Sequence, residues 1–541
     1  MPCPRVSTAR ASVSPLAASC CRLALAIVRS RPGPLRRWWC RQPKFWTDFG
    51  LEHQVRSGSP GPQCRPSRRI TGGAVDQEQL REKVSEAGAR LEVPGVAVGV
   101  YHDGEEHYGF HGVTSIENPL PVDENTLFQF GSTGKTFTAT AMLRLVDQGL
   151  VDLNETVRTY VPEFRLKDED TAAKVKVGQL FNHTAGWSGD LLDNTGDGDD
   201  ALALYVAKMA DLEQVTPLGS TVSYNNASLS LAGRIIEKVT GKTYEQAIKE
   251  LVFEPLGLTA SYFFTNDIMT RRFAVGHTQH PDGKVAVARP WALPRGSHPA
   301  GGISSTAGDQ IKWARFHLGD GRAEDGSRVL AEELLKSMQQ PTVDMRGSAL
   351  GDHVGLSWLL RNVDGVRLVS HGGSTNGQYS AFVMVPEREF AVAVLTNCGP
   401  NGSELHDELV KWALEAYLGV IDKDPDPVEL SEADLVPYAG HYETIAAECD
   451  VTVEGTGLLV KVTIKPEVLA QIRESGEDVP DEPPIPLGLL PGEGDRYIVS
   501  GGPAKGMKGY FVRSPSGEVE AVHMGGRLAT RTSVAAGAGS R

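Results

Sequence analysis

The segment Phe130-Gly131-Ser132-Thr133-Gly134-Lys135-Thr136 sets a glycine-flanked serine and lysine between two apolar patterns. Upstream, residues 126–130 are short and rich in aromatic side chains, which is typical of a β-strand. Downstream, residues 137–150 repeat Ala, Leu, Met and Val at helical spacing, and Gly149 supplies a stop signal. The pattern therefore predicts that Ser132 lies at the N-terminus of a helix.

A serine at the N-terminus of a helix is well placed to act as a nucleophile. Free backbone N–H groups and the positive end of the helix dipole favour a developing negative charge beside Ser132. Lys135 follows three residues later, and positions i and i+3 share one face of a helix, so its amine can approach the hydroxyl group. A buried lysine can lose its charge and act as a base.

Two other interpretations stay open for this segment alone. A chain of this length is expected to contain roughly two Ser-x-x-Lys matches by chance. The segment also looks like the end of a phosphate-binding Gly-x4-Gly-Lys-Thr loop, although that motif needs glycine at position 129 and the residue is Gln129.

Composition restricts the class of protein. The 541 residues suggest two or three domains, and 23% charged with 40% apolar residues is ordinary for a soluble globular protein. Residues 1–70 hold 13 Arg and Lys against two acidic residues, so the net charge of −14 leaves −25 on the remainder. This acidic body argues against a nucleic-acid partner.

The first 74 residues do not look like part of a fold. Their best apolar stretch, residues 16–28, is short and contains Arg22, which fits neither a membrane-spanning helix nor a clean signal peptide. We interpret residues 1–74 as a basic extension that is disordered or not translated. There is no firm membrane signal, and the lack of a clean signal peptide favours a cytoplasmic location.

No metal or cofactor is predicted. Beyond residue 74 only Cys398 and Cys449 remain, and neither Cys-x-x-Cys nor His-Glu-x-x-His occurs. An aspartate cluster does not have the spacing of a calcium loop, so a solvated surface loop is expected for Asp190, Asp193, Asp197, Asp199 and Asp200.

The order of elements counts against the nucleotide interpretation. Residues 76–91 have the pattern of an amphipathic helix, and residues 95–101 and 106–113 alternate as two strands around an Asp-Gly turn. A phosphate loop normally follows the first parallel strand of its domain, whereas here a helix and an antiparallel hairpin come first.

Two further polar clusters stand beside predicted elements. Ser223-Tyr224-Asn225-Asn226-Ala227 precedes a predicted helix at 229–239, and a phenol and an amide two residues apart in a turn can face one pocket. His371-Gly372-Gly373-Ser374 precedes predicted strands at 380–385 and 390–396, and its glycines allow close approach of a substrate or of backbone. An Asx turn with a packing tyrosine, and a tight turn with an incidental histidine, are the alternatives.

Other segments are given structural roles. His183, in a turn of small residues, is expected to fix backbone more often than to act as a base. Residues 299–306 are expected to form a strand leading into a helix capped by Thr306 and Asp309, with no chemistry assigned. Residues 404–418 predict a helix.

The C-terminal part changes character after a charged, proline-containing linker at 422–428. Short alternating segments with glycine turns then predict a small all-β domain, interrupted by an acidic, proline-rich loop; the segments are 441–443, 449–464, 497–500 and 509–522.

Three motifs occur in order along the chain: Ser-x-x-Lys, then Tyr-x-Asn about ninety residues later, then His-x-Gly. The probability that all three occur together by chance is far below that of any one of them. With this combination, the chain resembles the serine β-lactamase and penicillin-binding-protein superfamily, most of all the class C-like branch with D,D-carboxypeptidases, D-aminopeptidases and family VIII esterases. The resemblance covers about residues 76–420, including the stretches 182–186 and 300–302.

The fold implied by the resemblance is α+β, with an antiparallel sheet, flanking helices and a helical subdomain, followed by a small all-β domain. We place the hydrolase domain at 75–420, the linker at 421–436 and a β-barrel-like domain at 437–535, which resembles the lipocalin-like appendages of some relatives.

The resemblance also implies roles for the site residues. Ser132 would form an acyl-enzyme, with Lys135 and Tyr224 sharing general-base and general-acid work and an ammonium lowering the pKa of the phenol. Asn226 would hold the Lys135 amine and the substrate amide. The backbone N–H groups of Ser132 and Ser374, the latter after Gly373, would form the oxyanion hole.

One position departs from β-lactamases of this branch, which carry lysine where this chain has His371. A neutral imidazole offers a carboxylate at most a hydrogen bond, so the resemblance implies small esters, amides or peptides as substrates rather than β-lactams. This preference is expected to weaken below about pH 6.5, where an unperturbed imidazole gains a proton. A β-lactamase, a D,D-carboxypeptidase or D-aminopeptidase proper, an acyltransferase and a catalytically silent scaffold are the alternatives.

Overall fold

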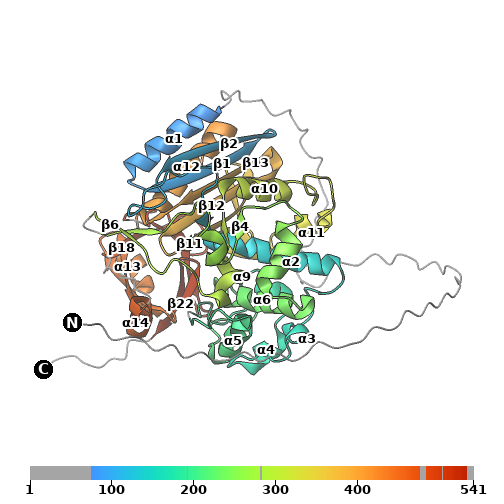
Figure 1. Ribbon diagram of the computed structural model, residues 1–541. Helices are drawn as coiled ribbons and strands as arrows, with labels where there is room; N and C mark the ends of the chain where they lie inside the picture. Colours follow the sequence, from blue (N-terminus) through green and yellow to red (C-terminus); the bar gives the residue numbers. More distant parts are fainter. Residues whose placement is uncertain (1–74, 192, 281–282, 475–482, 503, 533–541) are drawn as a thin grey trace, which may run out of the picture. The chain divides into compact units, whose positions relative to one another are not determined.

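The computed structural model describes residues 75–191, 193–280, 283–474, 483–502 and 504–532 (Figure 1). The interpretation of residues 1–74 lies outside the described residues. All the elements below belong to one compact unit that runs from residue 69 onward.

An eight-stranded antiparallel sheet forms the centre of the hydrolase domain, in the order β2-β1-β13-β12-β11-β10-β9-β8. The first hairpin agrees with the prediction, because Val98 pairs with Gly109 on one side and with Val394 of a late strand on the other. The sheet thus joins the two ends of the domain. Its strands are β1 (Gly95–His102), β2 (Glu105–Gly112), β8 (Val343–Ser348), β9 (Gly351–Val354), β10 (Leu359–Val363), β11 (Val366–Thr375), β12 (Gln378–Val385) and β13 (Phe390–Thr396).

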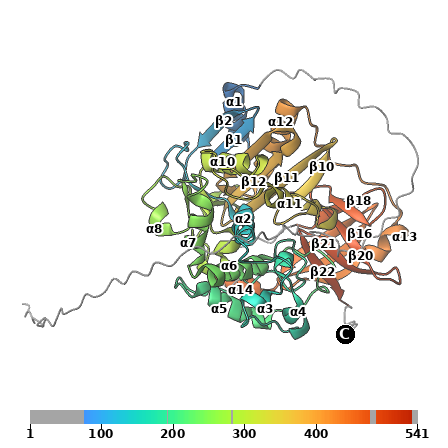
Figure 2. The same ribbon diagram turned by 90° about the vertical axis from the view of Figure 1, so that its right-hand side faces the viewer.

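Helices cover both faces of this sheet, because its strands alternate side chains between two cores. Helices α1 (Gln77–Arg90) and α12 (Asn401–Leu418) lie side by side on one face (Figures 1 and 2), where Val98 and Val394 pack with Leu405. Helices α2 (Gly134–Asp147) and α10 (Ala307–Leu318) cover the other face. Side chains at positions i and i+2 of a strand therefore enter the same core.

A helical subdomain surrounds α2, and its members make one continuous apolar core with the sheet. Several of these helices are only one turn long, as expected for segments that connect site residues rather than span the domain. They are α3 (Val157–Tyr160), α4 (Glu169–Lys174), α5 (Ala201–Lys208), α6 (Asn226–Thr240), α7 (Tyr244–Ile248), α8 (Thr265–Ile268), α9 (His298–Gly301) and α11 (Glu332–Ser337).

Two small sheets lie beside the central one. The strand before Ser132, β3 (Phe128–Gln129), pairs antiparallel with β7 (Ser304–Ser305), which also pairs with β4 (Ser261–Tyr262). This is not the parallel strand of a phosphate-loop domain, so the structure argues against the nucleotide alternative. The second small sheet consists of β14 (Cys398–Gly399), β5 (His277–Gln279) and β6 (Val285–Val287).

Two predicted segments differ from the structure. His371 was expected before a strand, but it lies within β11, whose ladder with β12 continues to Thr375. The segment expected to be a strand at 299–306 begins instead with the short helix α9, since Pro299 fits the first turn of a helix, where no N–H is needed. Thr306 does cap α10, accepting a hydrogen bond from the Asp309 backbone.

The C-terminal part is a closed barrel of eight antiparallel strands with its own apolar core. Its last strand pairs with its first, as His441 pairs with Thr532. The strands are β15 (Gly440–Glu443), β16 (Ala447–Glu454), β17 (Gly457–Ile464), β18 (Ile485–Leu489), β19 (Arg496–Val499), β20 (Lys508–Arg513), β21 (Val519–Met524) and β22 (Arg527–Thr532), with helices α13 (Glu432–Leu435) and α14 (Pro466–Glu474). The predicted α+β class and the all-β C-terminal domain are confirmed. Within the described ranges, no helix has both the length and the apolarity needed to cross a bilayer.

Candidate active site

Ser132 lies in a single 3-10 turn, Gly131–Thr133, that leads directly into α2. Gly131 has φ +56°, and a Cβ there would come within 2.6 Å of the Ser374 carbonyl oxygen. Glycine is therefore required both by the backbone conformation and by the close approach of β11. The turn therefore places Ser132 in close contact with β11, the strand that carries His371.

Lys135 is completely buried and points at the serine. Its Nζ donates to Ser132 Oγ at 2.9 Å and to the Ala300 carbonyl oxygen at 2.7 Å. Burial lowers the pKa of Lys135 well below its usual value, and the nearby Arg527 lowers this pKa further, while Asp190 opposes the shift. This shift favours the neutral form of the amine, which a general base needs.

Tyr224 completes a triangle with these two residues. Lys135 Nζ lies 4.9 Å from the centroid of its ring, and the phenol is hydrogen-bonded to Ser132. Burial raises the pKa of Tyr224 above its usual value, and this effect outweighs the hydrogen bond to Ser132 and the charge of Arg527. The expectation that a lysine ammonium would lower this pKa is wrong, because the dominant influence is burial. The phenol keeps its proton and can donate it.

Asn226 has a different partner from the one expected. Its Nδ2 donates to Asp190 Oδ1 at 2.9 Å, while the carbonyl oxygen of Ala300 accepts from the Lys135 amine. The described hydrogen bonds of the Lys135 amine do not include Asn226, and the role of Asn226 in holding that amine stays a prediction. Asp190, expected on a solvated loop, is instead a site residue whose side chain is only 18% exposed.

The partner of Asp190 comes from the C-terminal barrel. Arg527 at the start of β22 donates through Nε and Nη2 to the two carboxylate oxygens of Asp190, at 2.5 and 2.9 Å. Its guanidinium carbon lies 5.3 Å from the centroid of the Tyr224 ring. The preceding Gly526 carbonyl accepts from the Tyr224 backbone N–H at 2.8 Å. The hairpin that joins β21 and β22 thus contributes a charged residue to the site.

Ala300 is held by a buried ionic network. Glu245 on α7 accepts from His298 Nδ1 at 2.7 Å and from Arg295 at 3.0 and 3.1 Å, which fixes the turn that leads to Ala300. Burial alone would raise the pKa of Glu245, but hydrogen bonds from His298 and Arg295 lower it to about 2. Sequence analysis missed this network because its members are separated by about fifty residues of unrelated pattern.

His371 is buried on the same side of β11 as the serine, with its ring centroid 6.3 Å from that of Tyr224. Its Nδ1 donates to the Gly372 carbonyl at 2.6 Å, which leaves Nε2 as an acceptor without a partner. Burial lowers the pKa of His371 to about 3, and Lys135 lowers it further. The expected change of preference below pH 6.5 is therefore wrong, because the imidazole stays neutral far below that pH.

His183 fixes the other flank of Tyr224. Its carbonyl oxygen accepts from the Ser223 N–H at 3.0 Å, and its Nδ1 accepts from the Asn225 N–H at 3.2 Å. Its ring is tilted against the tyrosine ring, with the two centroids 4.4 Å apart. These contacts agree with the backbone-fixing role expected for it. Burial lowers the pKa of His183 well below its usual value, so the ring is uncharged.

The free edge of β11 faces the serine. Strand β10 pairs with β11 only as far as Ser370, so the following residues pair with β12 alone. A Cβ on Gly373 would lie 2.5 Å from the Ser132 backbone nitrogen, so only glycine allows this contact. The Ser374 backbone lies against Gly131, and its share in an oxyanion hole stays a prediction.

An antiparallel sheet with a helical subdomain, and a serine hydrogen-bonded to a buried lysine beside a tyrosine, are the features of hydrolases of the serine β-lactamase and penicillin-binding-protein superfamily. The chain belongs to the Beta-lactamase family, whose model matches residues 80–416.

Among curated proteins, it is 34% identical over 375 residues to a penicillin-binding protein 4 of Amycolatopsis lactamdurans, covering 68% of this chain and 98% of that protein. It is 27% identical over 340 residues to a β-lactamase of Yersinia enterocolitica, covering 56% of this chain and 82% of that protein. Among solved structures, SurE has a TM-score of 0.66 at 24% identity, covering 84% of this chain and 99% of SurE. A class C β-lactamase from Rhodobacter sphaeroides has a TM-score of 0.51 at 23% identity, covering 62% and 99% of the two chains. These two structures support the fold alone.

Proposed function

We propose that the protein cleaves small esters, amides or peptides through an acyl-enzyme on Ser132. The observation that carries this proposal is the 2.9 Å contact between Lys135 Nζ and Ser132 Oγ, combined with the lowered pKa of that amine. A neutral amine within hydrogen-bond distance can take the proton of the hydroxyl as its oxygen attacks a carbonyl carbon.

The remaining steps follow from the same groups. Tyr224, which keeps its proton, donates it to the leaving alkoxide or amine and is reprotonated by the Lys135 ammonium. Water then attacks the acyl carbon and gives a proton to Lys135; the bond to Ser132 Oγ breaks, this oxygen takes the proton back from the Lys135 ammonium, and the acid is released. Backbone N–H groups of Ser132 and Ser374 are the proposed donors to the oxyanion in both halves of the reaction.

The charges around the site favour a neutral acyl group. His371 is uncharged, and the Nε and Nη2 donors of Arg527 are already used by Asp190, so neither of these residues offers an unpaired cation to a substrate carboxylate. The free edge of β11 offers backbone groups to an extended acyl chain, which suits peptides and amides.

A carboxypeptidase-like or acyl-transfer activity is the second candidate. Arg527 stands over the Tyr224 ring, and a substrate carboxylate that shared its guanidinium would be placed beside the proton donor. The similarity to a penicillin-binding protein 4 is consistent with this candidate.

The test is a substrate panel with intact-protein mass spectrometry. p-Nitrophenyl butyrate, D-amino-acid amides, a peptide ending in D-Ala-D-Ala and a cephalosporin are compared, and the expected result is turnover of the first two with an acyl adduct on Ser132. Ser132→Ala is expected to lose the adduct and the turnover, while Ser220→Ala, on an exposed turn, keeps both. Efficient cephalosporin hydrolysis with no turnover of esters or amides would refute the proposed preference, and an adduct retained by Ser132→Ala would refute the nucleophile.

A further inference from the structure

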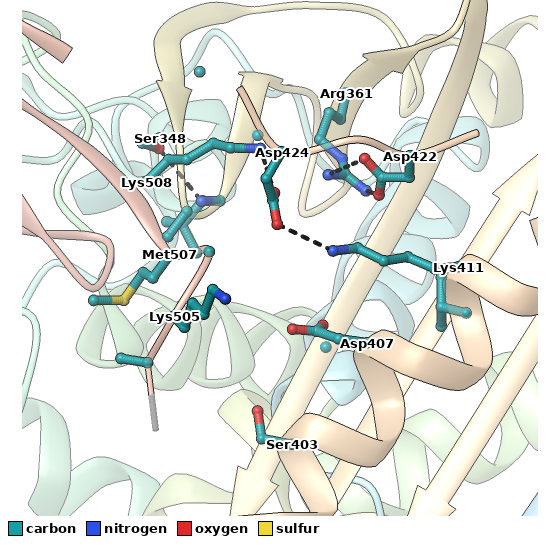
Figure 3. A pocket seen from close by; sticks show the side chains of 18 of the residues that line it. Ser348, Arg361, Ser403, Asp407, Lys411, Asp422, Asp424, Lys505, Met507 and Lys508 are labelled. Atoms are coloured by element: carbon teal, nitrogen blue, oxygen red, sulfur yellow. Dashed lines mark hydrogen bonds and ion pairs between the residues drawn. The ribbon is translucent and has the colours of Figure 1, made fainter. Parts of the chain in front are cut away.

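A second cavity of about 1150 Å³ lies on the other face of the central sheet from Ser132. Its floor includes Ser370 and Gly372 of β11, which alternate along the strand with His371 and Gly373 of the active site. Its walls come from α12, from the linker at 421–425 and from the barrel loop at 504–508 (Figure 3). Of the residues assigned to the active site, His371 also borders this space, whereas Ser132, Lys135 and Tyr224 are not in its lining.

Most charges in its walls are already paired. Arg361 of β10 donates to both carboxylate oxygens of Asp422, at 2.6 and 3.3 Å. Asp424 lies 3.3 Å from the ammonium of Lys411 on α12 and 3.3 Å from that of Lys508 on β20. These ion pairs connect the linker to the central sheet, to α12 and to the barrel. They therefore stabilise the arrangement of the cavity walls.

Three charged side chains in the lining have no such partner among the described residues: Asp407, Lys505 and the exposed Lys423 of the linker. Among the residues that the structure describes, the side chains of Asp407 on α12 and Lys505 in the barrel loop make no hydrogen bond or ion pair. Figure 3 shows them on facing walls, pointing toward each other across open space, with the hydroxyl of Ser403 nearby. The gap between them can therefore be filled by a molecule with two charged ends.

The electrostatics favour a cation beside Asp407. Burial raises the pKa of this carboxyl group; Lys411 and Arg361 counteract the rise, and Asp424 and Asp422 add to it. Pairing with a ligand ammonium would restore the stabilisation that the ionised carboxylate lacks. The lining holds five aspartates beside four lysines and two arginines, so a ligand with several negative charges would find little net positive charge, which argues against a nucleotide or polyphosphate.

We propose that this cavity binds a small zwitterion, a free α-amino acid or a dipeptide, with its ammonium on Asp407 and its carboxylate on Lys505. Both contacts are charge-assisted hydrogen bonds, which are about twice as strong as neutral ones. Pockets of about 300–1,000 Å³ are usual for small ligands, so a dipeptide fits with room for water. The site does not depend on the proposed reaction at Ser132.

Isothermal titration of the full chain carrying Ser132→Ala, which prevents turnover, tests this binding with glycylglycine as the probe. Glycinamide lacks the carboxylate and N-acetylglycine lacks the ammonium, and each is expected to bind at least tenfold more weakly. Asp407→Asn and Lys505→Gln are each expected to weaken glycylglycine binding at least tenfold. Glu404→Gln is the matched control, because Glu404 is on the same helix but acts on Arg90 of α1, and it should leave binding unchanged.

Thermal unfolding of each variant checks that it is folded, since both substituted side chains face open space and removing their charge breaks no internal bond. Absence of binding by glycylglycine in the background protein would overturn the proposal. Binding that survives both Asp407→Asn and Lys505→Gln would place the probe elsewhere and would also overturn it. A loss with Lys505→Gln alone would indicate an anion site and refute the zwitterion.

Discussion

Removing Arg527 or Asp190 should move the acid side of the pH–rate profile in opposite directions. Lys135 must be neutral to take the proton of Ser132, so kcat/KM falls as the pH falls through the pKa of this amine. Arg527 lowers that pKa and Asp190 raises it. Arg527→Gln should therefore shift the fall to higher pH, and Asp190→Asn should shift it to lower pH.

The size of the effect follows from the shared tyrosine ring. Lys135 Nζ lies 4.9 Å and the Arg527 guanidinium carbon 5.3 Å from the Tyr224 centroid, so the two charges are no more than about 10 Å apart. At an effective dielectric constant of about 20, that separation corresponds to roughly 1.6 kcal/mol. Because the Arg527 side chain is 38% exposed, water screening reduces this to about 1 kcal/mol, or about a fivefold change in kcat/KM on the acid side.

The assay is kcat/KM for the best ester substrate between pH 4 and 9, in the wild type, both single variants and the double variant. Each profile is normalised to its own plateau, so a uniform loss of activity does not affect the comparison. The double variant should return close to the wild-type position. Arg513→Gln, which breaks a similar pair with Asp495 elsewhere in the barrel, is the control and should not move the profile. Shifts in the same direction for both single variants would refute the reasoning.

Four further outcomes are expected. The ring of His371 should not titrate between pH 4 and 8, because burial keeps it neutral; an NMR midpoint in that range would contradict this. Glu245→Gln should lower kcat about tenfold with little change in KM, because the turn that positions the Ala300 carbonyl, which accepts from the Lys135 amine, loses its support. If kcat and the pH profile stayed unchanged, Glu245 would have only a structural role. The folded pKa of Glu245, about 2, lies below its unfolded value, so the stability that it contributes is present above about pH 4.5 and disappears toward pH 2; the same variant should flatten acid unfolding followed by circular dichroism in that window. Deletion of residues 1–70 should leave Tm and kcat/KM unchanged, because this segment lacks an apolar pattern that could pack on the body; loss of either would contradict the interpretation.

The elements predicted from the sequence are those whose signal is local. Helix α1 and the β1–β2 hairpin follow from periodicity within a few residues, and the helix after Ser132 follows from the same kind of pattern. The three polar motifs could be linked because their combination is rare, and the structure brings Ser132, Lys135 and Tyr224 together.

The parts that sequence analysis missed depend on long-range packing. Asp190 stands among other aspartates, and nothing near it indicates that its partner, Arg527, is 337 residues further along the chain. The Ala300 carbonyl is a backbone group, which no side-chain pattern can mark. The pKa of Tyr224 was expected from a neighbouring charge and an unperturbed pKa was expected for His371, whereas burial dominates both in the folded protein.

The position of Arg527 makes completion of the site depend on closure of the barrel. Strand β22 both closes the barrel against β15 and begins with the arginine that reaches Asp190. A protein that lacked β22 would lose this guanidinium, and Asp190 would keep only its hydrogen bond from Asn226. Damage to the barrel seam would therefore change the charge near Lys135 without altering any residue of the hydrolase domain.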